Sequence, residues 1–204
     1  GNFGQVGSNN LHTAFLPVIG NTDETQLKPG KTLKRTAFHH MMPIAGMYPP
    51  AILPDEILKA GDKRIRAVVC ESSNPLLTYP DSAAQEEAFK ALDLLVVVDP
   101  YPSATAAMAA MPGKAEDQNP NRAVYLLPAA TQFETSGSVT ASNRSLQWRE
   151  KVIEPLWESR SDHMIMQQFA DKLGFGKELS KNFKMQQVKG MDEPVIEDIL
   201  REIN

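Results

Sequence analysis

The run Leu94-Leu95-Val96-Val97-Val98, followed by Asp99-Pro100, decides the fold expected of this sequence of 204 residues. An unbroken run of apolar residues is typical of a strand that is buried on both faces, as strands of parallel sheets are. The run is far shorter than the roughly 20 apolar residues that a membrane-spanning helix requires. It therefore predicts a strand over residues 94–98 in a covered parallel sheet.

Segments of similar character lie on both sides of this run. Residues 65–70 and 123–127 form two further short and mainly apolar runs, and both predict strands. Between the strands, the pattern Ser82-x-x-Gln85 predicts a capping box that opens a helix to about residue 92, and residues 104–111 predict a short helix. Strands and helices that alternate at this spacing favour right-handed βαβ crossovers. The predicted fold class is therefore α/β, with a parallel sheet flanked by helices.

The remaining sequence divides into a connector before the α/β domain and an extension after it. Residues 1–63 show little periodicity and predict an irregular connector. Residues 64–175 make up the predicted α/β domain, and residues 176–204 a peripheral helical extension. Short helices in the connector and the extension are expected at residues 55–60, 177–183 and 194–203.

The last part of the predicted domain follows a different pattern. Residues 139–141 and 146–148 predict either a small hairpin or bulged strands. A helix is expected over residues 163–173, because its apolar side chains recur four residues apart. Its ends are expected at a cap formed by Ser161 or Asp162 and at Gly174.

Composition excludes several classes of function. The formal net charge of −4 argues against an extended nucleic-acid-binding face. The single cysteine, Cys70, excludes an internal disulfide and any zinc or iron–sulfur cage built from the cysteines of this chain alone. Cys70 ends a predicted strand and is expected to be a core residue, and His39-His40 is expected to have a surface or packing role. The chain opens on Gly1-Asn2-Phe3-Gly4 without Met or a signal peptide, as a fragment or processed product would.

Small polar residues follow each of the three predicted strands. The strand ends carry Ser73-Asn74, Asp99 with Ser103 and Thr105, and Thr131. Open parallel sheets bind ligands at the carboxyl ends of their strands. A carboxylate such as Asp99 can accept hydrogen bonds from two adjacent N–H groups of a purine, and Ser or Asn can hold a sugar hydroxyl. The strand ends therefore predict a nucleotide-like ligand, with a plain turn as the alternative at Asp99. The polar residues Glu134 and Asp162 can equally serve as caps or solvated charges.

Four motifs resemble the catalytic subunits of molybdopterin oxidoreductases of the dimethyl-sulfoxide-reductase type, and they occur in the same order. They are Ser73-Asn74-Pro75, the stretch at residues 97–105, the stretch at 126–134 and the stretch at 137–144. The run Glu-Thr-Ser-Gly-Ser-Val-Thr-Ala-Ser-Asn-Arg-Ser-Leu-Gln-Trp-Arg at residues 134–149 is most similar to a bacterial formate dehydrogenase large (alpha) subunit. The opening Gly1-Asn2-Phe3-Gly4-x-x-Gly7 also matches a Gly-Asn-x-Gly-x-x-Gly stretch of the family.

The resemblance implies a Rossmann-like half of a domain that binds molybdopterin guanine dinucleotide, with molybdenum or tungsten in the intact enzyme. Asp99 would take the guanine edge, and Asn74 the sugar or phosphate side. Ser103 and Thr105 stand where the family often has Thr-x-Thr, whereas Thr135 stands where some relatives have Lys. The implied cofactor-binding residues are Ser73, Asn74, Val98 through its main chain, Asp99, Ser103, Thr105, Thr135 and Asp162.

The resemblance also implies an activity and partners for the intact subunit. The reaction would be the oxidation of formate to carbon dioxide in anaerobic respiration, with a [4Fe-4S] cluster upstream of this chain and an iron–sulfur electron-transfer subunit as partner. No residue of this chain is expected to be catalytic or to bind the metal, so the chain alone is expected to be inactive. The bacterial periplasm is the expected location of the intact enzyme, with the cytoplasm as the alternative. Two other readings stay open: a molybdopterin oxidoreductase that acts on nitrate or another oxyanion, and a free-standing α/β nucleotide-binding module without redox function.

Overall fold

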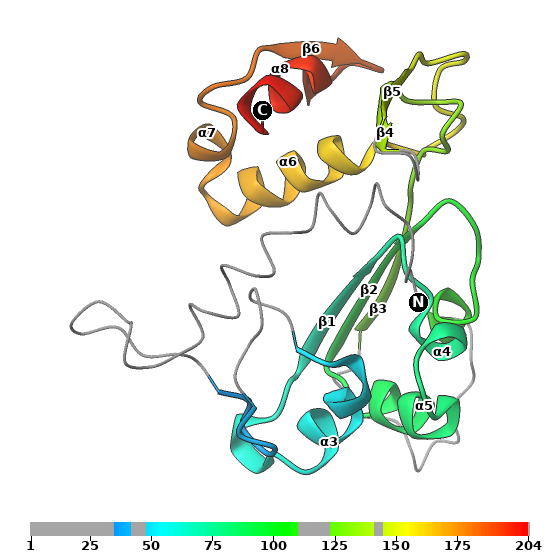
Figure 1. Cartoon of the computed structure of the whole chain (residues 1–204), viewed down its shortest axis with the longest axis vertical. Coiled ribbons are helices and arrows are strands. Elements are labelled where there is room, and N and C mark those ends of the chain that lie inside the picture. Colours follow the sequence, from blue (N-terminus) through cyan, green and yellow to red (C-terminus); the bar gives the residue numbers. More distant parts are fainter. Residues whose placement is uncertain (1–34, 42–47, 110–122, 141–144, 204) are drawn as a thin grey trace, which may run out of the picture. The chain divides into compact units, whose positions relative to one another are not determined.

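A computed structural model describes residues 35–41, 48–109, 123–140 and 145–203 of the chain (Figure 1). By their contacts, the residues divide into two compact units, of which the first ends at Leu126 and the second begins at Leu127. This division falls inside the range 64–175, which the sequence predicts as one domain, and the predicted domain limits stay predictions. The glycine motif that begins at Gly1 lies outside the described residues.

Among the described residues, three parallel strands form a sheet that lies mainly in the first unit. They are β1 (Ala67–Glu71), β2 (Leu94–Asp99) and β3 (Ala123–Pro128), in the spatial order β1-β2-β3 (Figure 1). In the parallel pair β1 and β2, Val69 lies opposite Val96 and Cys70 lies opposite Val97. The predicted α/β fold class is confirmed. The three predicted strands differ from the observed ones by one or two residues at their ends.

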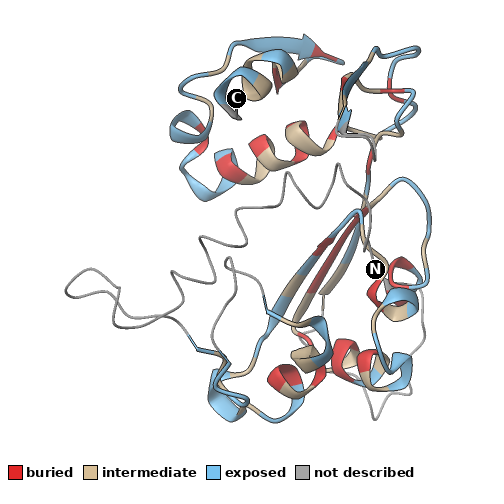
Figure 2. Ribbon diagram, in the orientation of Figure 1, coloured by how far each residue is buried: buried red, intermediate tan, exposed pale blue. Residues whose placement is uncertain are grey.

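Helices pack against this sheet and enclose the core of the first unit. They are the short 3-10 helices η2 (Pro50–Ile52), η3 (Gly61–Lys63) and η4 (Ala106–Ala109) and the α-helices α3 (Leu53–Leu58), α4 (Pro75–Thr78) and α5 (Ser82–Lys90). The core consists of the buried residues Ile57, Cys70, Ala88, Phe89, Leu92, Leu95, Val97, Ala106 and Met108. Strand β2 is buried along most of its length, as the unbroken apolar run predicts (Figure 2).

The two faces of the sheet differ in exposure. Successive side chains of a strand point to opposite faces. On β1, Val68 and Cys70 pack against the core, whereas Val69 between them is 54% exposed. On β3, Val124 packs against the core, whereas Tyr125 is 56% exposed. On the face opposite the helices, the outer strands β1 and β3 therefore expose apolar side chains, whereas Val96 of β2, which pairs with Val69, is buried.

Two predicted helices of the first unit have other limits than expected. α3 begins at Leu53 rather than at residue 55, because Pro54 fits the first turn of a helix. An N–H in that turn has no hydrogen-bond partner within the helix, so the N–H that proline lacks is not needed there. Of the predicted helix at 104–111, residues 106–109 form the 3-10 helix η4, and residues 110–111 lie outside the described part of the chain.

The start of α5 corrects a second prediction. Its N-cap is Asp81, whose side chain accepts a hydrogen bond from the N–H of Ala84 at 3.1 Å. The capping box predicted with Ser82 as the cap is therefore wrong. Gln85 is fully buried and donates to the carbonyl of Pro50 at 3.4 Å, so this side chain fastens the helix to η2 instead of capping it.

The described residues of the second unit form two antiparallel hairpins and three helices. Its elements are β4 (Gly137–Thr140), β5 (Leu146–Arg149), α6 (Asp162–Leu173), α7 (Gly176–Leu179), β6 (Met185–Val188), β7 (Met191–Pro194) and α8 (Ile196–Ile203). The first hairpin confirms one of the two predictions for this region. α6 is capped by Ser161, which accepts from the N–H of Met164, and it ends at Gly174, which has a positive φ of 87°. Both ends of α6 are as predicted.

The hairpin of β6 and β7 was not predicted, so the extension is not wholly helical. The predicted helix at 177–183 is limited to the four residues of α7, and the predicted helix at 194–203 begins at Ile196. Lys189 and Gly190 make the two-residue turn of the hairpin with φ values of 51° and 74°. Two positive φ values in succession are the geometry that lets a two-residue turn match the twist of the strands. No helix in the described residues is long and apolar enough to cross a membrane.

Candidate functional site

The loops after β1 and β2 are joined through Asn74 and Thr105. Oδ1 of Asn74 accepts hydrogen bonds from the backbone N–H of Thr105 at 3.1 Å and from its hydroxyl at 2.8 Å. Oγ1 of Thr105 in turn accepts the N–H of Leu76 at 3.2 Å, and Thr105 is fully buried. The amide nitrogen of Asn74 donates no hydrogen bond to a described residue. Asn74 therefore keeps two N–H donors for another molecule, whereas the hydroxyl of Thr105 is used within the fold.

Asp99 ends β2 beside these loops and has one carboxylate oxygen engaged. Oδ1 accepts the N–H of Tyr101 at 2.9 Å, the first N–H after Pro100. The other oxygen accepts no hydrogen bond from a described residue, and the side chain is half-buried. A carboxylate has about four acceptor positions, so Asp99 retains most of its capacity to bind two adjacent donors. A turn role and a ligand role are thus compatible at this residue.

Three other predicted residues lie at the same strand ends. Oγ of Ser103 accepts the N–H of Ala106 at 3.3 Å at the start of η4. The carbonyl of Val98 accepts the N–H of Ser72 at 3.1 Å, so this main-chain acceptor is in use. Ser73 is half-buried and makes no hydrogen bond to a described residue. The structure therefore brings six of the predicted residues to the carboxyl ends of β1 and β2. They are Ser73, Asn74, Val98, Asp99, Ser103 and Thr105.

Thr135 belongs to the second unit, in a loop that the buried carboxylate of Glu134 fixes. Glu134 accepts the N–H of Thr131 at 2.7 Å and the N–H of Leu156 at 2.6 Å, and the residue is 5% exposed. Burial raises the pKa of this carboxyl, but the backbone N–H groups of Thr131 and Leu156, together with the Thr131 side chain and the charge of Lys189, hold the pKa below the ordinary value of 4.5. The guanidinium of Arg149 donates to the carbonyl of Thr135 at 3.3 and 3.4 Å. Sequence reasoning left Glu134 as a cap or a solvated charge, and the structure shows a buried anchor.

Asp162 lies in the first turn of α6 and has a buried oxygen without a partner. Oδ1 of Asp162 accepts no hydrogen bond. Burial raises the pKa of this carboxyl above its ordinary value of 3.8, and the nearby His163 opposes the rise only in part. A buried polar atom without a partner costs about 1–3 kcal/mol and is rare in native structures. The orphaned oxygen therefore keeps acceptor capacity that no described residue uses, while it is closed to solvent in this structure.

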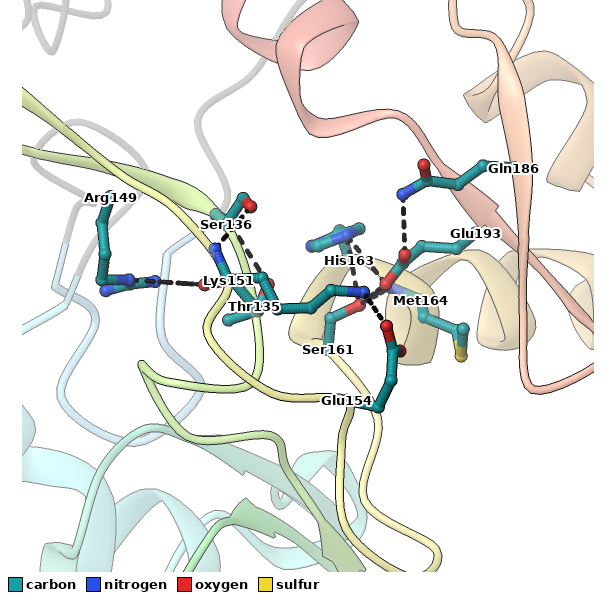
Figure 3. A network of polar contacts seen from close by, with 10 residues as sticks. All are labelled: Thr135, Ser136, Arg149, Lys151, Glu154, Ser161, His163, Met164, Gln186 and Glu193. Atoms are coloured by element: carbon teal, nitrogen blue, oxygen red, sulfur yellow. Dashed lines mark hydrogen bonds and ion pairs between the residues drawn. The ribbon is translucent and has the colours of Figure 1, made fainter.

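Hydrogen bonds join Ser161 and His163, the two neighbours of Asp162 in the chain, to Glu193 (Figure 3). The hydroxyl of Ser161 donates to Oε1 of Glu193, and Nε2 of His163 lies 3.1 Å from both Oγ of Ser161 and Oε1 of Glu193. Gln186 donates to the other oxygen of Glu193 at 2.9 Å. Burial raises the pKa of Glu193, but its hydrogen bonds with His163 and Ser161 bring the pKa below 4.5. Sequence reasoning missed His163 and Glu193, because no pattern indicates a contact between residues so far apart in the chain.

The network does not have the geometry of a nucleophilic site, although it contains Ser, His and a carboxylate. The contact between Nε2 of His163 and Oε1 of Glu193 requires a proton on Nε2 when the carboxylate is ionised, so Nε2 cannot act as the base for Ser161. The hydroxyl of Ser161 also points to Glu193, and Ser161 is 2% exposed. The arrangement is therefore suited to holding the start of α6 in place.

The residues expected to have plain structural roles do so in the described part of the chain. His39 contacts the carboxylate of Asp55 at 2.9 Å, in a turn that is fastened to Glu56 through the backbone N–H groups of Phe38 and His39. Cys70 is buried in the core, and burial raises the pKa of its thiol to about 11. No group of His, Cys, Asp and Glu among the described residues is arranged to hold a metal ion.

Two large hollows of the first unit lie away from the carboxyl ends of the strands. One, of about 770 Å³, is lined by Arg64, Arg66 and Asp93, which pair with one another near the amino ends of β1 and β2. The other, of about 990 Å³, lies between the turn at 35–40 and the helices η2 and α3. Neither hollow contains a predicted site residue. A smaller cavity of about 130 Å³ in the second unit is lined by Thr135, His163 and Glu193 among others.

Comparisons with known proteins agree with the motifs. The family model described as molybdopterin oxidoreductase matches residues 4–172. The F420-dependent formate dehydrogenase subunit alpha of Methanocaldococcus jannaschii is 32% identical over 130 residues, which cover 64% of this chain and 17% of that protein. Formate dehydrogenase H of Escherichia coli is 27% identical over 57% of this chain and 14% of its own length. The nitrate reductase of Klebsiella oxytoca is 29% identical over 62% of this chain and 13% of its own length.

A solved structure shows the same fold. Acetylene hydratase from Pelobacter acetylenicus superposes with a TM-score of 0.52 at 21% identity, over 69% of this chain and 17% of that one. The chain thus spans about a sixth or less of the length of these proteins. The family match extends over most of the chain, from before β1 to the end of α6. The chain therefore belongs to the molybdopterin oxidoreductase family.

Proposed function

We propose that this chain binds molybdopterin guanine dinucleotide, with molybdenum or tungsten, in a formate dehydrogenase alpha subunit. The observation that carries the proposal is the free hydrogen-bonding capacity at the ends of β1 and β2 in a chain of this family. Asp99 offers acceptors, and the amide of Asn74 offers donors. Guanine presents two neighbouring donors on one edge, and a nucleotide presents ribose and phosphate oxygens, so the residues present fit this ligand.

The residues of the chain would have distinct tasks toward the dinucleotide. Asp99 would accept the ring N–H and the exocyclic amine of guanine, and Asn74 would donate to a sugar or phosphate oxygen. Ser73 has a free hydroxyl for the same part of the ligand. Ser103 and Thr105 would support these groups from within the loops.

The second unit offers two further contacts, and we include both in the proposal. Asp162 has the buried oxygen without a partner, and Thr135 lies on a loop that Glu134 and Arg149 fix. Thr135 is neutral where some members of the family carry Lys. Any contact from Thr135 to a phosphate would therefore be a hydrogen bond rather than an ion pair.

The chemistry of the intact enzyme would be the two-electron oxidation of formate to carbon dioxide, with release of one proton. The bound pterin and its metal supply that redox chemistry, and this chain supplies binding and orientation. The formate dehydrogenase alpha subunits among the relatives support formate as the substrate. A [4Fe-4S] cluster, an iron–sulfur partner subunit and a periplasmic location are further parts of the proposal, which follow from the family resemblance.

A second candidate function is the reduction of nitrate. The nitrate reductase of Klebsiella oxytoca is about as similar to this chain as the formate dehydrogenases are, and this observation keeps the candidate. The two functions differ in the direction of electron flow, so one assay format distinguishes them.

The test uses the complete gene product that contains this sequence, purified without oxygen. Molybdenum, tungsten and acid-released guanine nucleotide are measured per protein, and activity is followed as formate-dependent reduction of a viologen dye. We expect one metal ion, two guanine nucleotides if the cofactor is a pair, and formate-dependent turnover. Nitrate-dependent oxidation of the reduced dye without formate turnover would favour the second candidate. Absence of guanine nucleotide from active, metal-containing protein would overturn the dinucleotide proposal.

A further inference from the structure

We propose that Ser161, His163 and Glu193 are positioning residues that hold the carboxylate of Asp162 ready for the dinucleotide. This inference rests on the proposed function, because it assigns a task to groups beside one of the proposed binding residues. Nothing in the motifs of the sequence points to Glu193.

The first step concerns Asp162 itself. Its Oδ1 is buried and has no hydrogen-bond partner, although the side chain stands in the first turn of a helix of twelve residues. A carboxylate at that position is favoured by the partial positive charge of the helix N-terminus, but that charge does not supply the missing donor. A fold keeps such an unpaired oxygen only if other interactions prevent the side chain from turning to water.

The second step concerns the residues on either side. Ser161 and His163 flank Asp162 in the chain, and both contact Oε1 of Glu193 on strand β7. The hydroxyl of Ser161 also accepts the N–H of Met164 and so caps the helix. The backbone before and after Asp162 is therefore fastened to the same carboxylate.

The third step concerns what fastens Glu193. Its second oxygen accepts a hydrogen bond from Gln186 on strand β6, directly opposite in the hairpin register. Glu193 is 7% exposed, so these contacts are shielded from water and from salt. The hairpin of β6 and β7 thus acts as a brace for the first turn of α6 (Figure 3). Without the brace, we expect the first turn to fray and the Asp162 carboxylate to reach solvent.

Two substitutions of Glu193 distinguish the effect of its hydrogen bonds on the position of Asp162 from the effect of its charge. Glu193→Ala removes both the charge and the acceptor for Ser161 and His163. Glu193→Gln removes the same charge but keeps an acceptor for Ser161, and the amide of Gln186 can turn to pair with the new amide. Gln186→Ala removes a single hydrogen bond at an exposed residue and serves as the mild variant if Glu193→Ala does not fold. Glu158→Ala, at an exposed carboxylate outside the network, is the matched control.

Two readouts are measured on this chain of 204 residues. The first is the pH titration of the Asp162 carboxyl carbon by NMR without ligand, and the second is the affinity for GDP by calorimetry. We expect Glu193→Ala to bring the Asp162 pKa back to its ordinary value and to weaken GDP binding about tenfold, the loss for roughly one hydrogen bond to a charged group. Gln186→Ala should shift both readouts in the same direction by less. Glu193→Gln and Glu158→Ala should leave GDP affinity within about twofold of the wild type.

The outcomes distinguish this inference from the proposed function. An unchanged Asp162 titration in both Glu193→Ala and Gln186→Ala would overturn the positioning role, even if the melting temperature falls. A loss of affinity in Glu193→Gln as large as in Glu193→Ala would also overturn it, because charge rather than position would then matter. Wild-type protein that does not bind GDP would count against the proposed function, while the titration of Asp162 would still decide on the brace.

Discussion

Asp99 is the residue on which the guanine assignment can be tested most directly. In Asp99→Asn the amide oxygen can still accept the N–H of Tyr101, so the turn should remain, but the NH₂ group would face the donors of guanine. We expect the complete protein to stay folded and to lose about 2–4 kcal/mol of cofactor binding, as for an unpaired buried polar group. Metal and guanine nucleotide content per protein, together with a melting curve, measure this. Asp62→Asn at an exposed residue is the control, and wild-type loading of Asp99→Asn would refute the guanine role.

Cys70 predicts a dependence of stability on pH in the alkaline range. Its pKa is raised from 9.0 to about 11 by burial, so the folded state favours the thiol. This contribution is fully present below pH 9 and is lost as the pH rises toward 11. We expect the free energy of unfolding to fall by about 2 kcal/mol between pH 8 and pH 10.5 from this group, since one pKa unit corresponds to 1.36 kcal/mol. Urea unfolding of the wild type and of Cys70→Ala at both pH values checks this, and equal pH dependence in the two proteins would refute it.

For single residues, the sequence predicted which positions follow the strands, but it did not predict the contacts that these residues make. Asn74 and Asp99 follow strands, and the rule for carboxyl ends of parallel strands is enough to select them. The contact between Asn74 and Thr105 depends on how two loops fold over the same edge, which no spacing indicates. Pro100 removes one N–H that could compete for Asp99, yet the next one, of Tyr101, takes that place.

Among the elements, the loop from Thr131 to Thr135 depends on the single carboxylate of Glu134. Glu134→Gln would replace one acceptor by a donor that faces a backbone N–H, so we expect a loss of about 1–3 kcal/mol in the free energy of unfolding at pH 7. The folded-state pKa of Glu134 lies below 4.5, so its stabilising effect is present above that pH and is lost as the pH falls through the folded-state value.

Urea unfolding at pH 7 and at pH 3 measures this effect. The difference between the wild type and Glu134→Gln should shrink at the lower pH, because the carboxyl of the unfolded state, with its ordinary pKa of 4.5, is then mostly protonated and part of the stabilising effect is lost. Glu158→Gln, at an exposed position of the following segment, is the matched control and should change little. A difference that stays constant with pH would contradict the role of the ionised carboxylate.

Elements with strong local determinants were predicted well, and the others were not. β2 and α6 have an apolar run or a cap and a terminal glycine, and both were found within one residue of the expected limits. The start of α5 was misjudged because two possible caps, Asp81 and Ser82, stand side by side, and the conformation of the preceding turn selects Asp81. The hairpin of β6 and β7 was missed because its strands are short and polar, although the Lys189-Gly190 pair is compatible with a tight turn.

For the molecule as a whole, the apolar side chains that β1 and β3 expose on one face of the sheet predict self-association of the chain by itself. Parallel sheets occur almost only with both faces covered, and Val69 and Tyr125 are more than half exposed. We expect sedimentation equilibrium to show dimers or larger species at micromolar concentration. The double substitution Val69→Lys and Tyr125→Lys should shift the chain to monomer, while Leu77→Lys, at an apolar residue of α4 that is 75% exposed, should not. A monomeric wild type, or an equal effect of the control, would refute the prediction.

The fold class and the family were within reach of the sequence because both depend on local runs and motifs. The sequence gives a physical reason for only some of the proposed site residues, because Ser73 to Thr105 belong to one unit and Thr135 and Asp162 to the other. Strand-end reasoning reaches the first group, since its rule concerns the sheet itself. Asp162 came from resemblance alone, and the physical reason to consider it, a buried oxygen without a donor, appears only in three dimensions.

Because Cys70 is buried in the core, its reaction with a thiol reagent reports local opening of the protein. A bulky maleimide cannot reach Cys70 while Phe89 and Leu95 pack in the same cluster, and the protonated sulfur is a poor nucleophile near neutral pH. The labelling rate therefore counts how often the region between β1 and α5 opens, and with no other thiol in the chain the mass spectrum needs no site assignment. A bound nucleotide that closes the loops after β1 should slow that rate, so ligands can be screened without an activity assay.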